Sequence, residues 1–346
     1  MDLPKVSDID VKDKKVLLRL DLDLTDEEIN VGNIRLRSAL ETLNYLISEG
    51  SKIVIIGHRG RPSHEASSGE TVPSDQEKFS LKPIALVLSE LTGKEVLFEE
   101  EGDITLKENL RFDPREESND PEFAKKLASL GEIYINEAFG VSHREHASIV
   151  GVPKLLPGAV GLHFAAEIEN LDKVIEHPKR PLVYVISGLK EDKLSYVKAF
   201  EPHADKILIG GRLPDFLGDE KLVSVRLRKE DEKLIVGNLI MDNEDITLNT
   251  IERFEKEIEK AGTVVLAGPL GRYEDEGHRQ GTERVFKAIV ASSAIKIAGG
   301  GDTEAAISLL GMENKFDWIS VGGGAMLDFL AKHTLPGIES LRPHSN

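Results

Sequence analysis

Short apolar runs alternate with amphipathic, helix-patterned segments along most of the chain, and this alternation limits the possible folds more than any other feature. The apolar runs are typical of buried strands and lie at residues 15–20, 52–57, 95–98, 132–136, 182–186, 206–210, 263–267, 295–298 and 318–321. The segments patterned as helices are 37–49, 82–92, 121–130, 193–200, 249–260, 281–292, 304–310 and 326–332. Strands that alternate with helices predict an α/β fold built on parallel sheets.

The chain has 346 residues, a length that favours two domains over one. A helix-patterned segment at 164–177 has no strand before it and is followed by Pro178 and Pro181. We therefore predict a first domain over 1–163, a hinge helix over 164–177 and a second domain over 178–334. The stretch 63–78 is rich in Ser, Glu and Gly and is predicted to be a mobile loop.

Composition and charge narrow the range of functions. Apolar residues make up 40% of the chain and charged residues 30%, as in soluble globular proteins. No apolar run is long enough to span a membrane, and the N-terminus carries acids where a signal peptide has a basic and then an apolar stretch. The absence of cysteine excludes disulfides, thiolate zinc sites and cysteine nucleophiles, and it fits a cytoplasmic protein. A net charge of −17 argues against general nucleic-acid binding and makes any local basic cluster informative.

Basic residues follow several strands of the predicted first domain. They are Arg35 and Arg37 at the start of the first helix, His58, Arg59 and Arg61 after the second strand, Arg111, and His143, Arg144 and His146 after the fourth strand. Ligands of open parallel sheets bind beyond the carboxyl ends of the strands, so these loops are expected to converge. Guanidinium groups match phosphate and carboxylate oxygens, and the pattern therefore predicts an anion site, although any single arginine could be an ordinary solvated loop residue.

Glycine-bearing turns follow the strands of the predicted second domain. They contain Gly188, Gly210 and Gly211, Gly268, Gly299 to Gly301, and Gly322 to Gly324. A strand, a glycine turn and a helix start together present free backbone N–H groups and the positive end of a helix dipole to an anion. Any one of them could be a packing turn, but the series predicts a polyphosphate site that is neither a Walker A loop nor a dinucleotide fingerprint. Asp302 either caps the helix after a glycine triplet or holds Mg²⁺ beside the phosphates.

A cationic patch in one domain and a phosphate cradle in the other predict phosphoryl transfer between a small anion and a nucleotide. This reaction depends on positioning and positive charge more than on a nucleophilic side chain. Closure of the two domains would exclude water and so prevent hydrolysis.

These motifs, in this order and spacing, resemble those of the phosphoglycerate kinase family over nearly the whole chain. The matching segments are Arg19–Asp21, Gly57–Pro62, Glu108–Phe112, Asn136–His146, Gly210–Gly211, Gly268–Gly271, Gly299–Thr303 and Gly322–Ala325. The resemblance implies two Rossmann-like domains, with phosphoglycerate bound in the first and Mg²⁺ with ATP or ADP in the second, and a tail over 335–346 that returns to the first domain. It also implies reversible phosphoryl transfer between 1,3-bisphosphoglycerate and ADP, giving 3-phosphoglycerate and ATP, by a monomer whose partners are small molecules.

The resemblance also implies site residues, position by position. Phosphoglycerate would be held by Asp21, Asp23, Arg35, His58, Arg61, Arg111 and Arg144. The transferring phosphoryl group would be neutralised by Arg35 and Lys190, helped by N–H groups of the triplets that contain Gly300 and Gly323. The nucleotide would be bound by Gly188, Lys190, Lys193, Gly210, Gly211, Pro269, Glu274, Gly299, Gly300, Gly301, Thr303, Gly322, Gly323 and Gly324, with Glu274 at the ribose, and Asp302 would bind the metal.

The chain departs from the family pattern in both sites. The replaced positions are Asp23, Ala267 and Val321, where the family has asparagine, asparagine and threonine, and Asp245–Leu248, where it has Asp-Ile-Gly-Pro. Lys193 lies three positions after Lys190, where the family's second lysine lies four positions on, and the segment 211–245 is much shorter than usual. Three functions remain open: a phosphoglycerate kinase of reduced size, a paralogue that phosphorylates another anionic carboxylate, and a non-catalytic module that binds nucleotide or anions.

Overall fold

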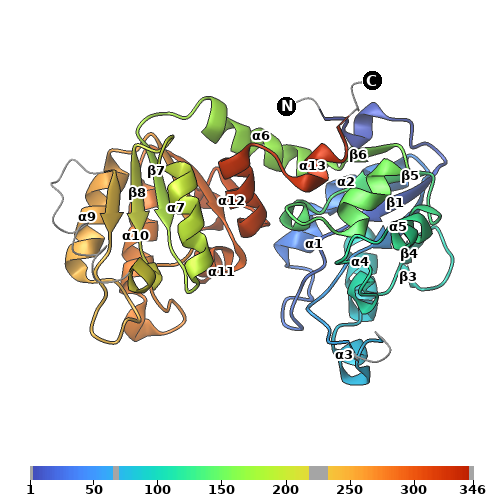
Figure 1. Cartoon of the computed structure of the whole chain (residues 1–346), viewed down its shortest axis with the longest axis horizontal. Helices are drawn as coiled ribbons and strands as arrows, with labels where there is room; N and C mark the ends of the chain where they lie inside the picture. The colour runs from blue at the N-terminus through green and yellow to red at the C-terminus, as the bar shows by residue number, and fades with distance from the viewer. Residues whose placement is uncertain (1–2, 65–69, 218–232, 343–346) are drawn as a thin grey trace. The chain divides into compact units, whose positions relative to one another are not determined.

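Residues 3–64, 70–217 and 233–342 are described by the computed structural model of the chain. The chain divides into two compact units: unit 1 is Met1–Ile168 with Thr334–Asn346, and unit 2 is Glu169–His333. It passes from unit 1 to unit 2 within helix α6 (Leu162–Glu176) and returns to unit 1 after His333. Each unit is built around its own parallel sheet (Figure 1).

Unit 1 contains a six-stranded parallel sheet in the order β3-β4-β2-β1-β5-β6. Its strands are β1 (Lys15–Arg19), β2 (Lys52–Ile56), β3 (Leu97–Phe98), β4 (Ile104–Leu106), β5 (Ile133–Asn136) and β6 (Gly158–Val160). Its helices are α1 (Ile34–Ser38), α2 (Leu40–Ser48), α3 (Pro73–Lys78), α4 (Lys82–Thr92), α5 (Pro121–Ala128), the start of α6, and α13 (Pro336–Glu339).

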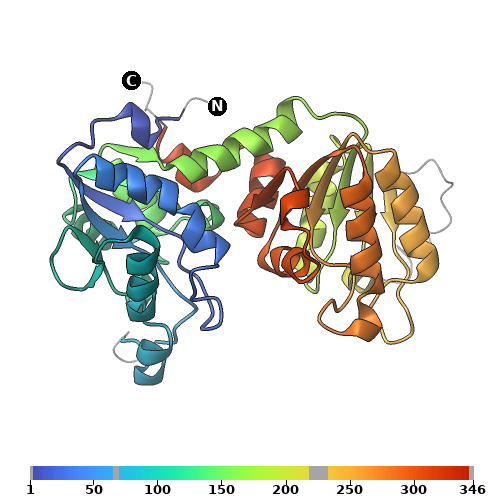
Figure 2. The same cartoon turned by 180° about the vertical axis from the view of Figure 1, so that it is seen from behind.

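The strands of unit 1 explain why its polar residues gather at one edge of the sheet. β1 is buried from Val16 to Arg19, as expected for a parallel strand that is covered on both faces. Helices α2 and α4 lie together over one of these faces and join its apolar core (Figure 2). Arg19 at the end of β1 is in register with Ile56 of β2 and Asn136 of β5, so the loops that follow these strands start side by side.

Unit 2 contains a second six-stranded parallel sheet, in the order β12-β11-β10-β7-β8-β9. Its strands are β7 (Leu182–Ile186), β8 (Lys206–Ile209), β9 (Leu234–Val236), β10 (Thr263–Ala267), β11 (Ile295–Gly299) and β12 (Trp318–Ser320). Its helices, besides the end of α6, are α7 (Leu194–Phe200), α9 (Leu248–Glu259), α10 (Gln280–Ala291), α11 (Gly301–Leu309) and α12 (Gly323–Lys332). Helices α9 and α10 pack together on one face of the sheet, and α7 packs with α12 on the other (Figures 1 and 2).

The α/β class with two parallel-sheet units confirms the fold that the alternating pattern predicts. The prediction of a mobile loop over 63–78 is wrong for its last part, because Pro73–Lys78 form helix α3. Residues 65–69 of that prediction lie outside the described residues. Pro73 at the start of α3 is preorganised for a helix, and Asp75 accepts a hydrogen bond from Ser63 N–H at 2.8 Å. None of the α3 residues is buried, so the helix carries no apolar periodicity.

Short elements account for the other differences. The sequence gives no prediction of β4, β6 or β9, which have three residues each and are too short to show a period. The single helix predicted over 37–49 is instead two helices, α1 and α2, that meet at Ala39. Within the described ranges, none of the helices combines the length and the apolar character needed to span a bilayer.

Candidate active site

The loops after the strands of unit 1 bring basic side chains together. The charges of Arg19, Arg111 and Arg144 all act on His58, and together with burial they hold its pKa well below the usual value. Burial also lowers the pKa of Arg111. The charge of Glu117 opposes this effect, and the charge of Arg144 lowers the pKa further. The strand-end residues His58, Arg111 and Arg144, which lie far apart in the sequence, therefore form one cationic cluster.

His58 is a neutral hydrogen-bond donor in this cluster. Its Nδ1 lies 2.8 Å from Nη2 of Arg19, and a guanidinium can only donate, so Nδ1 is the acceptor. The ring proton of the neutral imidazole is therefore on Nε2. This Nε2 atom lies 3.8 Å from a carboxylate oxygen of Asp23.

Several buried nitrogens of the cluster and of its neighbour His146 make no hydrogen bond with the described part of the chain; they include His58 Nε2, Arg111 Nε, Arg144 Nε and His146 Nδ1. Buried polar groups are nearly always hydrogen-bonded, and each one left without a partner costs about 1–3 kcal/mol. The cluster contains more cationic donors than acceptors. Its chemistry suits an anion with several oxygens, such as a phosphorylated carboxylate.

Acidic residues at the rim of the cluster are held by hydrogen bonds. Asp23 accepts a hydrogen bond from Gly60 N–H at 2.7 Å, and its main-chain carbonyl accepts one from Nη1 of Arg35. Asp21 accepts from the Asp23 N–H at 3.3 Å. The Asp23 carboxylate is thus held in place by a main-chain donor, while Arg35 contacts the main chain of the same residue.

Two neighbouring arginines of the loop after β2 differ in their burial and in their hydrogen bonds. Arg61 is exposed, whereas Arg59 is buried and donates to the carbonyls of Leu24 and Lys78 and to Asp26. Arg59 therefore fixes the loop. This leaves Arg61 as the arginine of this loop that a ligand can reach.

Sequence reasoning noted Arg19 in the first strand but missed its supporting role and the buried residues that pair with it. Arg19 is fully buried and donates from Nε to Ser148 Oγ at 2.9 Å. Glu116 is also fully buried; it accepts from Ser148 N–H at 3.0 Å, and one of its oxygens lies 3.8 Å from His146 Nδ1. Burial raises the pKa of Glu116, and Arg19 opposes this effect. An arginine within an otherwise apolar strand is the one signal that could have pointed to this layer.

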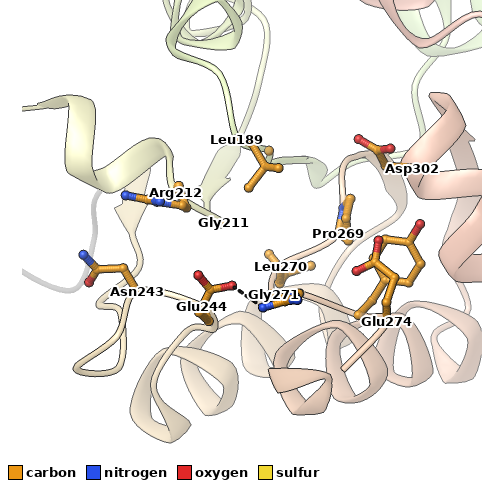
Figure 3. A pocket seen from close by; sticks show the side chains of 13 residues that line it. Leu189, Gly211, Arg212, Asn243, Glu244, Pro269, Leu270, Gly271, Glu274 and Asp302 are labelled. Atoms are coloured by element: carbon orange, nitrogen blue, oxygen red, sulfur yellow. Dashed lines mark ion pairs between the residues drawn. The ribbon is translucent and has the colours of Figure 1, made fainter. Parts of the chain in front are cut away.

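A cavity of about 570 Å³ lies at the carboxyl ends of the unit 2 strands (Figure 3). It is lined by Gly188, Leu189, Gly211, Arg212, Asn243, Glu244, Pro269, Leu270, Gly271, Arg272, Tyr273, Glu274 and Asp302. Four residues predicted for the nucleotide, Gly188, Gly211, Pro269 and Glu274, are on this wall together with Asp302, which was predicted for both nucleotide and metal. Such a volume accommodates a nucleotide-sized ligand.

The same cavity has polar residues that the sequence did not reveal. Glu244 and Arg272 form an ion pair, with Oε2 and Nη1 3.9 Å apart, and Arg212 and Asn243 lie on the same part of the wall (Figure 3). Burial and the charge of Glu274 raise the pKa of Tyr273 to about 12, so its hydroxyl is neutral at physiological pH. The cavity therefore has a polar wall beside the apolar side chains of Leu189 and Leu270.

The two glycine triplets meet backbone to backbone. A Cβ atom added to Gly323 would overlap the Cα and N atoms of Gly300, so only glycine permits this approach. Gly300 has a φ of 108° and precedes α11, and Gly322 precedes α12. The amino ends of two helices, each with unsatisfied N–H groups, are thereby brought together.

Side chains near the triplets tie the turns to one another. Thr303 donates to the Gly299 carbonyl at 2.9 Å and accepts from Gly268 N–H at 2.8 Å, which links the turns after β10 and β11. Lys193 donates to the carbonyls of Ser187 (2.6 Å) and Ala267 (3.3 Å), and burial lowers its pKa. Its ammonium thus braces two turns, whereas Lys190 is exposed.

Comparison with known proteins identifies the family. The family model described as phosphoglycerate kinase matches residues 6–235 and 219–333, in two pieces that overlap within the shortened segment. Phosphoglycerate kinase of Dictyoglomus turgidum is 36% identical over 394 positions, covering 97% of both chains, and that of Staphylococcus aureus is 38% identical over 397 positions, covering 97% of this chain and 98% of its own. Both alignments are longer than the 346 residues of this chain, so the relatives carry residues that it lacks.

Solved structures agree with this assignment. The phosphoglycerate kinase structures from Coxiella burnetii and Pyrococcus horikoshii each superpose with a TM-score of 0.80 at 27% identity and cover 98% of this chain. The alignments cover 99% and 98% of those two chains. The chain belongs to the phosphoglycerate kinase family.

Proposed function

We propose that this chain catalyses reversible phosphoryl transfer between 1,3-bisphosphoglycerate and ADP, giving 3-phosphoglycerate and ATP. The chain is a phosphotransferase of the phosphoglycerate kinase family. The observation that carries the proposal is the cluster of buried, unsatisfied nitrogens on His58, Arg111, Arg144 and His146. A substrate with a phosphate at one end and a carboxylate at the other supplies the oxygens that these groups require.

In this proposal, residues 1–163 with the tail 335–346 form the phosphoglycerate-binding domain. His58 donates from Nε2, and Arg61, Arg111 and Arg144 pair with substrate oxygens. Asp21 and Asp23 orient the loop and accept from the hydroxyl group on the middle carbon of the substrate. Arg35, which is already held at the Asp23 carbonyl, moves its charge to the transferring group.

Residues 178–334 form the nucleotide-binding domain, and 164–177 form the hinge helix. The N–H groups of the triplets around Gly300 and Gly323 hold phosphate oxygens, and the exposed Lys190 neutralises the charge that develops in the transition state. Pro269 and Glu274 line the part of the cavity that takes the nucleoside. Gly188, Gly210 and Gly211 let the chain approach the ligand without a Cβ, and the brace made by Lys193 holds these turns in place.

The site fits Mg²⁺ as well as nucleotide. Asp302 lies in the first turn of α11, on the cavity wall, and its carboxylate is exposed. Mg²⁺ prefers one or two carboxylates combined with phosphate oxygens and water, which Asp302 and a bound nucleotide would provide. The ion would neutralise charge on the transferring phosphate.

We also propose that the protein acts as a cytoplasmic monomer with small-molecule partners. The lack of cysteine and the acidic composition support the first point, and the family resemblance supports the second. Asp23 favours a second candidate, a paralogue that acts on another carboxylate, because it adds negative charge where the family has a neutral amide. The shortened segment and the replacements at Ala267 and Val321 favour the third, a non-catalytic module.

A coupled assay tests the proposal. The full chain is given Mg²⁺, 3-phosphoglycerate and either ATP or GTP, beside a panel of other carboxylate acceptors. We expect turnover with 3-phosphoglycerate to exceed that with every other acid. Arg35→Ala should reduce kcat about 10²–10³-fold, because it removes a charge from the transition state, whereas Arg37→Ala, on the same helix but exposed, should not.

The alternatives give different results in the same assay. A better acceptor among the other acids would identify the paralogue and overturn the proposal. No turnover with any acid, combined with nucleotide binding by calorimetry, would identify the non-catalytic module.

A further inference from the structure

Three side chains with metal-binding donors meet in unit 2, away from the cavity at the strand ends. Asp172 and Glu176 are one turn apart on α6, and His333 follows α12 as its C-cap residue. One donor atom from each of the three lies within 4.8 Å of the others. Residues four apart on a helix face the same side, so α6 presents both carboxylates to the imidazole.

The distances are close to those of a metal site. Nε2 of His333 lies 2.9 Å from Oδ1 of Asp172 and 3.9 Å from Oε1 of Glu176. A tetrahedral Zn²⁺ with bonds of about 2.0–2.1 Å places its ligand atoms ~3.3 Å apart, between these two values. The Glu176 side chain is 49% exposed, so a small rotation can bring it into coordination.

The imidazole is held in position by the backbone and by a neighbouring ring. His333 is in the left-handed conformation (φ 58°), and its N–H donates to the Phe329 carbonyl at 2.7 Å. Its ring packs edge-on against Phe329, with centroids 5.8 Å apart. The Nε2 atom is thereby directed at the two carboxylates before any ion binds.

The local field favours a cation at this point. Both α6 and α12 end here, and the carboxyl end of a helix carries a partial negative charge, to which Asp172 and Glu176 add two carboxylates. A divalent cation is therefore the countercharge that this cluster of donors suits best.

We propose that Asp172, Glu176 and His333 form a binding site for a divalent transition-metal ion, and for Zn²⁺ in particular. An imidazole with two carboxylates favours Zn²⁺ over Mg²⁺ or Ca²⁺, which prefer oxygen ligands alone. The exposure of His333 (40%) and Glu176 leaves a coordination position for water. A bound ion would clamp the last turn of α6 to the end of α12, next to Thr334, where the chain leaves unit 2.

A second histidine provides a matched control. His278 also contacts two carboxylates, Asp242 at 3.0 Å and Asp275 at 2.8 Å, but through opposite ring nitrogens. The two acids therefore flank the ring and do not meet at one point. The donor types are the same in both places, and only the arrangement at His333 suits a single ion.

Calorimetry with ZnCl₂ on the full, nucleotide-free chain, in a background of Mg²⁺, tests the proposal. We expect one site of higher affinity that His333→Asn weakens at least about tenfold and that Glu176→Gln also weakens. Asparagine tolerates the left-handed conformation, so His333→Asn keeps the helix end. His278→Asn should bind Zn²⁺ as the unmodified chain does.

Thermal unfolding gives an independent readout. Zn²⁺ should raise the Tm of the unmodified chain and of His278→Asn, and it should raise that of His333→Asn less. Equal Zn²⁺ affinity in the unmodified chain and His333→Asn, or no binding by the unmodified chain, would overturn the proposal. Circular dichroism confirms that each variant is folded.

Discussion

Gly323→Ala should impair catalysis far more than it impairs folding. The added Cβ would overlap the Cα and N of Gly300, which are backbone atoms and cannot rotate away as a side chain can. One turn must therefore shift, and overpacking of this kind costs about 1–3 kcal/mol. That loss should lower Tm by roughly 2–4 °C per kcal/mol in a unit of this size. Displacing phosphate-binding N–H groups by ~1 Å should reduce kcat about 10²-fold.

Coupled kinetics and thermal unfolding in the same buffer measure both effects. Gly277→Ala is the matched control, because a Cβ there meets no atom closer than 3.5 Å and lies in the same unit. It should leave both readouts unchanged. If the Tm of Gly323→Ala fell as expected but its kcat were unchanged, the triplets would not hold the transferring phosphate and the reasoning would be refuted.

Three further outcomes are expected. Lys190→Ala should lower kcat about 10²–10³-fold with little change in Tm, because Lys190 is exposed; an equal loss in the exposed control Lys198→Ala would contradict this. Asp23→Asn should lower KM for phosphoglycerate roughly fivefold by removing about 1 kcal/mol of repulsion, while its amide oxygen still accepts from Gly60; a higher KM would contradict this. Burial and Arg19 lower the pKa of His146 to about 3, so the unfolded chain binds a proton at this histidine before the folded chain does. The free energy of unfolding is therefore highest above pH ~6.5 and falls as the pH drops toward 3, by up to about 1.4 kcal/mol per pH unit for this group. His146→Gln should show a shallower decline in unfolding free energy between pH 6 and pH 4 on urea titration, and an unchanged slope would contradict the assignment.

The positions of the strand-end loops could be predicted, because parallel strands place their carboxyl ends at one edge. That rule brought His58, Arg111 and Arg144 into one cluster from separate parts of the sequence. It could not separate Arg59 from Arg61, since the difference depends on which carbonyls the fold leaves within reach of each side chain. The pattern of charged residues in the loops indicates where a site lies. The packing of the folded chain decides which of these charged side chains a ligand can reach.

The nucleotide-side cavity shows a different limit. Gly188 and Gly211 could be predicted because turns with free N–H groups favour glycine, whereas Pro269 followed only from the family resemblance. Glu244 and Arg272 could not, because they come from segments far apart in the sequence that only the fold brings together, with the Arg272 N–H donating to the Glu244 carbonyl at 2.8 Å, and neither has a distinctive local pattern. The supporting layer of Glu116 and Ser148 was missed for the same reason: burial of a carboxylate is a property of the folded unit.

The brace made by Lys193 affects how alignments of this protein should be interpreted. Because its ammonium joins the turns after β7 and β10, selection for stability alone would retain a lysine here. A relative that had lost its activity could therefore still keep this lysine. In an alignment, the conserved lysine would then be taken wrongly as evidence of catalysis. Conservation of Lys193 therefore indicates that the fold is maintained. Conservation of the exposed Lys190 is the better indicator of an active enzyme.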